Sequence, residues 1–226
     1  LLPALVFCAL TIAVFCVANW QKSLHDIETE ASASIESAAS TASIRERLKL
    51  HAQFLRSLQA FAAANPDPAN NLQAWHLFAR NIDVATNLPG LFVFAYAPVI
   101  QRHEADRLTT GIQQQSDRAD FKIFPPIEDN IAAPVTFVAP DAPVQRKGIG
   151  FNLMSERTRR EAIEHAVINQ DVSLSGPIVL IYDQETKRPG FILTQGIFQP
   201  GMPINNIEER RLALSGIVVS AYRADE

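Results

Sequence analysis

The chain opens with nineteen residues that carry no charge, and this run limits what the rest can be. Residues 1–19 read LLPALVFCALTIAVFCVAN, and the first ionised side chain is Lys22. A bilayer core is about 30 Å thick and a helix rises about 1.5 Å per residue, so about twenty apolar residues span it. Segment 1–20 is therefore predicted to be a transmembrane helix. The alternative is a cleaved signal peptide, whose apolar stretch usually covers about 7–15 residues.

Composition removes several classes of function. The formal net charge is -4, and the basic residues are dispersed, which disfavours a nucleic-acid partner. Cys8 and Cys16 both lie in the apolar run, so the remaining chain has no cysteine for a disulfide or a metal. The five histidines show no metal-ligand spacing, and the sequence has neither a phosphate-binding glycine loop nor a nucleophile elbow. We predict no catalytic residue, cofactor or metal ion.

The segment after the apolar run is predicted to be a long stalk helix, residues 21–64. It contains no proline or glycine, and small or apolar residues recur every three or four positions. The small-residue seam suits pairing of two stalks, so a homodimer is expected. A disordered linker over residues 29–43, rich in serine and alanine, is the alternative. Pro66 and Pro68 then end the helix, because proline lacks the backbone donor that a helix needs.

Residues 65–226 are predicted to form one α+β domain, a PAS-like antiparallel sheet with flanking helices. A second helix begins after Pro68, and Ser155 is predicted to cap another helix over residues 156–170. Short apolar runs bounded by turn residues predict strands. These runs are residues 91–97, 121–124, 134–138, 172–175, 178–181, 191–198 and 216–222. The last strands are joined by short connections, which favours antiparallel pairing.

Polar residues set in apolar strands are the candidate site. Asn152 follows a glycine turn, and Thr194 interrupts a run of large apolar residues. A pocket with apolar walls and a few placed hydrogen-bonding groups is what a small-molecule site requires. The candidate walls are Phe92, Phe94, Phe121 and Phe137. The simpler interpretations are a turn or cap residue for Asn152 and an ordinary strand residue for Thr194.

A series of short motifs then runs in order through residues 88–223. They are YAPVI at 96–100, PVTF at 134–137, GFNLMS at 150–155, LSGP at 174–177, GFILT at 190–194 and LSGIV at 214–218. The series resembles the CHASE domain family, the extracellular sensor modules of receptor histidine kinases, including plant cytokinin receptors, and of bacterial diguanylate cyclases. The resemblance implies a stalk helix followed by PAS-like subdomains, with a ligand in the distal one.

The resemblance also implies roles for three residues. Asn152 matches an aspartate that contacts the adenine group in plant cytokinin receptors, Leu174 matches a position whose backbone faces the ligand, and Thr194 matches a threonine of the ligand-side strand. Asparagine still donates and accepts hydrogen bonds but carries no charge. That difference counts against cytokinin itself, although a cytokinin-like molecule stays within the expected class.

The leading functional hypothesis is an extracytoplasmic small-molecule sensor of a membrane-bound signalling receptor. Segment 1–20 would sit in the inner membrane, residues 20–226 would lie in the periplasm, and a histidine kinase or diguanylate cyclase output would lie downstream. The main alternative is an envelope protein-interaction or structural module without a small-molecule ligand. A membrane-tethered hydrolase is a third class, and the sequence offers it no catalytic set.

Overall fold

The computed structural model describes residues 42–65, 71–115 and 118–224. The chain divides into two compact units, Leu1–Lys49 and Leu50–Glu226. The predicted transmembrane segment 1–20 and residues 21–41 of the predicted stalk lie outside the described residues, whereas residues 42–64 are helical. In the described parts of the chain, no helix is both long and apolar enough to cross a bilayer.

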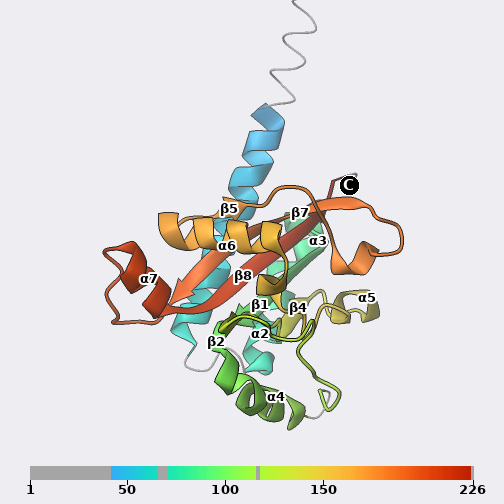
Figure 1. The fold of residues 1–226 in the computed structure, drawn as a ribbon. Coiled ribbons are helices and arrows are strands. Elements are labelled where there is room, and N and C mark those ends of the chain that lie inside the picture. Colours follow the sequence, from blue (N-terminus) through green and yellow to red (C-terminus); the bar gives the residue numbers. More distant parts are fainter. Residues whose placement is uncertain (1–41, 66–70, 116–117, 225–226) are drawn as a thin grey trace, which may run out of the picture. The chain divides into compact units, whose positions relative to one another are not determined.

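The second unit begins with helical residues and continues as alternating short helices and strands (Figure 1). The order after residue 64 is α2 (Leu72–Ile82), α3 (Val84–Asn87), β1 (Val93–Pro98), β2 (Ile100–Gln101), the 3-10 helix η1 (Arg102–Glu104), α4 (Ala105–Gln113), β3 (Ile131–Ala132), β4 (Phe137–Ala139), α5 (Pro143–Arg146), η2 (Leu153–Ser155), α6 (Arg157–Asn169), β5 (Ser173–Leu174), β6 (Ile178–Val179), η3 (Ile181–Asp183), β7 (Pro189–Phe198), α7 (Ile207–Ala213) and β8 (Leu214–Arg223).

A six-stranded antiparallel sheet organises this unit. Its strands pair in the order β4-β1-β8-β7-β5, and β6 pairs with β7 as well. The longest ladder joins β7 to β8, from Gly190 opposite Arg223 to Phe198 opposite Leu214. The predicted antiparallel pairing of the closing strands is therefore confirmed, and so is the α+β class.

One face of the sheet is covered by the helical segment before residue 65 and by α2. The Phe54 ring meets the Phe94 ring edge-on, with centroids 5.2 Å apart. Trp75 of α2 stacks on Tyr96 at 5.1 Å and on Phe137 at 5.2 Å. Because successive side chains of a strand point to opposite faces, these rings leave the alternate positions of β1 to the other face.

The other face is covered by α6 and by the segments around η2 and η3. Figure 1 shows α6 crossing β7 and β8 on this side. The hydrophobic core between this face and its covering segments contains Val93, Ala95, Val219, Ile192, Leu153, Ile163 and Leu180. Strand β1 is thus buried on both sides along its whole length, which explains its unbroken apolar run.

Two local predictions were wrong, and hydrogen bonding explains both. Glu156, rather than Ser155, caps α6, because its two carboxylate oxygens accept from the backbone N–H of Thr158 at 2.8 Å and of Arg159 at 3.1 Å. The predicted strand 121–124 does not form. Phe124 makes only an isolated bridge with Phe151, and the prolines that follow supply no backbone donor.

Candidate functional site

A small cavity lies inside the domain, between the α6-covered sheet face and the η2 and η3 segments. Its walls are mostly apolar, and they include Val93, Ala95, Val135, Leu153, Leu180, Ile192, Val219 and Ala221. Its volume is about 40 Å³, room for a few water molecules at roughly 10–15 Å³ each. This inner cavity is therefore too small for an organic ligand unless part of its wall moves.

Arg159 brings a charge into the lining of the inner cavity. The residue is only 6% exposed. Its guanidinium donates to the Val179 carbonyl oxygen at 2.8 Å and to the Glu156 carboxylate at 3.2 Å, and it lies 5.2 Å from the centre of the Phe151 ring. Burial lowers the pKa of Arg159, and Glu156 opposes that effect. Because three contacts hold it, the guanidinium is a fixed cation beside an apolar space.

Glu156 connects this cation to the start of α6. Burial raises the pKa of its carboxyl, but the hydrogen bonds from Thr158 and Arg159 outweigh burial, so the pKa lies below its ordinary value of 4.5. A depressed folded-state pKa means that the ionised group stabilises the fold above the ordinary pKa. That contribution is lost as the pH falls through the lowered value.

Replacing Glu156 by glutamine should therefore lower the free energy of unfolding at pH 7 by about 1 kcal/mol, the usual cost of weakening a helix cap. The difference from the parent protein should shrink as the pH falls below 4.5 and through the lowered pKa of Glu156, because the parent carboxyl then becomes neutral like the glutamine. Urea unfolding at pH 7 and pH 3 measures this. Glu161→Gln, on the exposed side of the same helix, is the control. An equal deficit at both pH values would contradict the role of the charge.

Tyr182 closes the side of the inner cavity formed by η3. Its ring packs against Phe92, with centroids 5.2 Å apart. At Gly148, an added Cβ would lie 2.1 Å from the Tyr182 hydroxyl, so only glycine leaves room for that ring. Burial raises the pKa of Tyr182, and Arg159 opposes the effect. The phenol is therefore a neutral group at the cavity wall.

An ion pair fixes the end of η3 to the end of β8. Asp183 is 5% exposed and accepts two hydrogen bonds from the Arg223 guanidinium, at 2.9 and 3.0 Å. The same guanidinium lies 3.9 Å from the centre of the Phe92 ring. The cavity wall and the last residue of the sheet are thus held together by one charged contact.

Thr194 lies beside the inner cavity on the same face of the sheet. It is paired in register with Val219, which lines the cavity, and with Ser173 of β5. Its side chain is fully buried, and its hydroxyl has no hydrogen-bond partner. Since buried polar groups are nearly always paired, an unpaired hydroxyl at this place needs an explanation.

Asn152 supports the wall of the inner cavity through its side-chain oxygen. That oxygen accepts from the backbone N–H of Ala133 at 3.0 Å and of Met154 at 3.1 Å, and the residue is 3% exposed. These bonds hold the η2 turn, whose Leu153 lines the cavity. The geometry is that of a cap, as the simpler interpretation of the sequence expected.

The remaining predicted residues are spread over the domain. Leu174 is 52% exposed on strand β5, next to the register pair that contains Thr194. Phe121 is buried beside a separate hollow. Phe94 and Phe137 lie on the sheet face that α2 and the helical segment before residue 65 cover, so the sheet separates them from the inner cavity. Only Phe92 meets the cavity wall, through Tyr182.

Sequence reasoning passed over Arg159 and Tyr182 as site residues. Arg159 lies in a helix rich in charged residues, and Tyr182 precedes a polar turn, so neither stands out as a polar group set in an apolar strand. The available signal was Arg159 itself, which lies one turn into a helix directly after the GFNLMS motif.

Throughout the described residues, no group of three or more histidine, cysteine, aspartate or glutamate side chains could hold a metal ion.

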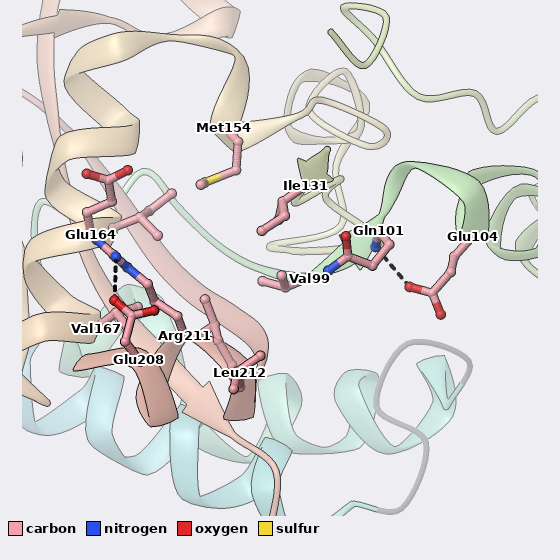
Figure 2. A pocket seen from close by; sticks show the side chains of 12 residues that line it. Val99, Gln101, Glu104, Ile131, Met154, Glu164, Val167, Glu208, Arg211 and Leu212 are labelled. Atoms are coloured by element: carbon pink, nitrogen blue, oxygen red, sulfur yellow. Dashed lines mark hydrogen bonds and ion pairs between the residues drawn. The ribbon is translucent and has the colours of Figure 1, made fainter. Parts of the chain in front are cut away.

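A second and larger hollow, the outer groove, lies between α6, α7 and the β2–η1 segment (Figure 2). Its volume is about 410 Å³. Figure 2 shows Glu164, Glu208 and Arg211 gathered on one side of it and Gln101 and Glu104 on the other. Helix α7 is held in place by Arg210, which donates to the carbonyl oxygens of Ile168 and Ile204.

A small apolar hollow with a few fixed polar groups is the kind of lining found in small-molecule sites. The chain belongs to the CHASE domain family, which matches residues 69–226. The resemblance found in the sequence is thereby confirmed. CHASE domains are extracellular sensory domains of membrane-bound signalling receptors. No curated protein matches the chain.

Proposed function

We propose that this chain is the small-molecule-sensing part of a transmembrane receptor, with a transmembrane helix at 1–20, a stalk at 21–64 and a periplasmic sensor domain at 65–226. The observation that carries the proposal is the inner cavity, where a fixed guanidinium stands among apolar walls and the unpaired Thr194 hydroxyl lies on the strand position paired with the lining residue Val219. A ligand with an apolar body and a hydrogen-bonding group would satisfy the Thr194 hydroxyl, which has no partner without it.

The wall at η3 is the part that would give way to a ligand. Organic ligands need pockets of about 300–1,000 Å³, and the inner cavity has about 40 Å³. Tyr182 fills the space next to Gly148 and packs on Phe92, so rotation of its ring away from Gly148 would enlarge the cavity. The backbone of Leu174 and the side chain of Thr194 would then face the ligand, as the family resemblance implies.

Signalling would follow from a difference in affinity between two states of the domain. A ligand shifts such an equilibrium only by binding one state more tightly. Stalks from two copies would pair and pass the shift through the membrane to a histidine kinase or diguanylate cyclase output. Arg56, on the helical segment before residue 65, forms an ion pair with Asp171 at 2.7 Å, and Gln59 donates to the Gly196 carbonyl oxygen at 2.7 Å. These contacts join that segment to the strand-bearing body.

The test is a thermal-shift screen of the 226-residue chain in lipid nanodiscs against small organic molecules, including N6-substituted adenines. Thr194→Val keeps the shape of the side chain and removes the hydroxyl. We expect it to weaken binding of a screening hit about tenfold, the worth of one hydrogen bond. It should also raise the free energy of unfolding by about 1 kcal/mol, because a buried unpaired polar group disappears.

Thr136→Val is the matched control, since Thr136 is also fully buried with an unpaired hydroxyl but, unlike Thr194, is not paired in register with a residue of the cavity lining. It should stabilise the fold to a similar degree and leave ligand affinity unchanged. Equal effects of both substitutions on affinity, or a screen without any hit, would contradict ligand binding at the inner cavity.

The tight interior favours a second candidate, an envelope protein-interaction or structural module. Neither Asn152 nor Thr194 is among the residues that line the inner cavity, and that cavity has room for only a few water molecules. In that case the screen would give no hit, and chemical crosslinking of the chain in its native envelope would instead trap a protein partner on the exposed surface of the domain.

A further inference from the structure

The outer groove has the size and the walls of a ligand site. Its volume, about 410 Å³, is an order of magnitude larger than that of the inner cavity and falls in the range of about 300–1,000 Å³ that small organic ligands occupy. Separate segments line it: Val99 and Gln101 form one wall, Ile131 and Met154 lie at the top in Figure 2, and α6 and α7 form the other wall.

The groove is apolar where its walls meet. Val99, Met154, Ile163, Val167 and Leu214 contribute this surface. At its rim, Leu212 is 76% exposed and Ile131 is 40% exposed, so large apolar side chains meet water there. Apolar surface of this kind gains free energy when a ligand removes it from water, at about 25 cal/mol per Å².

The charged groups of the groove are mostly acidic. Glu104, Glu164 and Glu208 line it, against a single cation, Arg211. Arg211 forms an exposed ion pair with Glu208 at 3.3 Å, and Glu104 accepts from the Gln101 backbone N–H at 2.8 Å. The side-chain carboxylate of Glu164, on α6, has no hydrogen bond or ion pair within the described residues. The lining therefore carries an excess of two negative charges, and its free carboxylate stands at the edge of the apolar surface.

We propose that the outer groove binds a free organic cation, an ammonium group on an apolar body of about the size of a phenylethyl group. The ammonium lies at the Glu164 carboxylate, and the apolar body rests on Met154, Ile163 and Val167. This site is separate from the inner cavity, which offers a guanidinium rather than carboxylates. It goes beyond the proposed function, because it adds a second binding site of opposite charge preference on the same domain.

The probe is phenethylammonium, titrated into the 226-residue chain in neutral-lipid nanodiscs and followed by ligand-observed NMR at low salt. Its anionic counterpart, 3-phenylpropionate, has a similar apolar body. We expect phenethylammonium to bind and 3-phenylpropionate to bind at least tenfold more weakly. Glu164→Gln should weaken phenethylammonium about fivefold, in line with the loss of one partly exposed charge contact, and Leu212→Ala should weaken it about twofold.

Glu161→Gln is the matched control, because Glu161 lies on α6 but outside the groove. Thr194→Val, which alters only the surroundings of the inner cavity, should leave phenethylammonium binding unchanged. Equal binding of the cation and the anion, or equal effects of the Glu164 and Glu161 substitutions, would overturn the proposal. These outcomes are independent of the library screen, so the outer groove can fail while ligand binding at the inner cavity stands, and the reverse.

Discussion

Trp75→Ala should lower the free energy of unfolding by about 3–5 kcal/mol, the usual cost of removing a large aromatic side chain from a core. Trp75 is fully buried. Its ring stacks on Tyr96 and Phe137 and meets the Phe61 ring edge-on at 4.9 Å. The substitution therefore leaves a void between α2, the preceding helical segment and two strands, and none of these can close it without moving the others.

Urea unfolding followed by far-UV circular dichroism measures this loss, since the fluorescence of Trp75 is removed by the substitution and only Trp20 remains. Leu77→Ala is the control on the same helix, because Leu77 is 52% exposed. It should change the free energy of unfolding by less than about 0.5 kcal/mol. If both substitutions cost the same, Trp75 does not join α2 to the sheet as the ring contacts indicate.

Arg223→Met is expected to cost about 3 kcal/mol. Asp183 is 5% exposed and takes both of its oxygen contacts from Arg223, so the substitution leaves a buried carboxylate without its cation. Removing one partner of a buried pair typically costs about 3–5 kcal/mol, and the 16% exposure of the Arg223 side chain places this pair at the lower end.

The double variant Asp183→Asn with Arg223→Met should recover part of the lost free energy of unfolding, because it no longer buries an unpaired carboxylate. Arg56→Met is the matched comparison. Arg56 pairs with Asp171, and their side chains are 51% and 57% exposed, so this ion pair should contribute less than about 1 kcal/mol to the free energy of unfolding. Thermal and urea unfolding of the four proteins measure these differences. A similar small loss for Arg56→Met and Arg223→Met would show that the buried pair has no special weight.

Much of the fold could be predicted because its long elements carry strong local patterns. Strands β7 and β8 are apolar runs bounded by turn residues, and α2 presents its apolar residues at helical spacing. Short elements were less predictable. The segment 121–124 has the composition of a strand, yet it has no neighbour to complete a ladder, and a strand exists only where another strand pairs with it.

The candidate site was harder to predict, because strands that are buried on both faces lose their period-two pattern. Phe92 and Phe94 lie two residues apart in the sequence, yet Phe94 packs on Phe54 and Phe92 on Tyr182. Nothing in an unbroken apolar run tells which rings border a cavity. Asn152 was found from its motif, but its use as a cap depends on Ala133, nineteen residues away in the chain.

The position of β8 has a consequence for how this protein is made. The last strand of the described chain lies in the middle of the sheet, where it pairs with β7 on one side and with β1, more than a hundred residues earlier, on the other. During synthesis, Val93–Pro98 must wait with an open edge until residues 214–223 have emerged. Such distant pairings slow folding and leave strands open to aggregation. A ribosome-stalled chain that lacks β8 should therefore need chaperone protection that the finished chain does not.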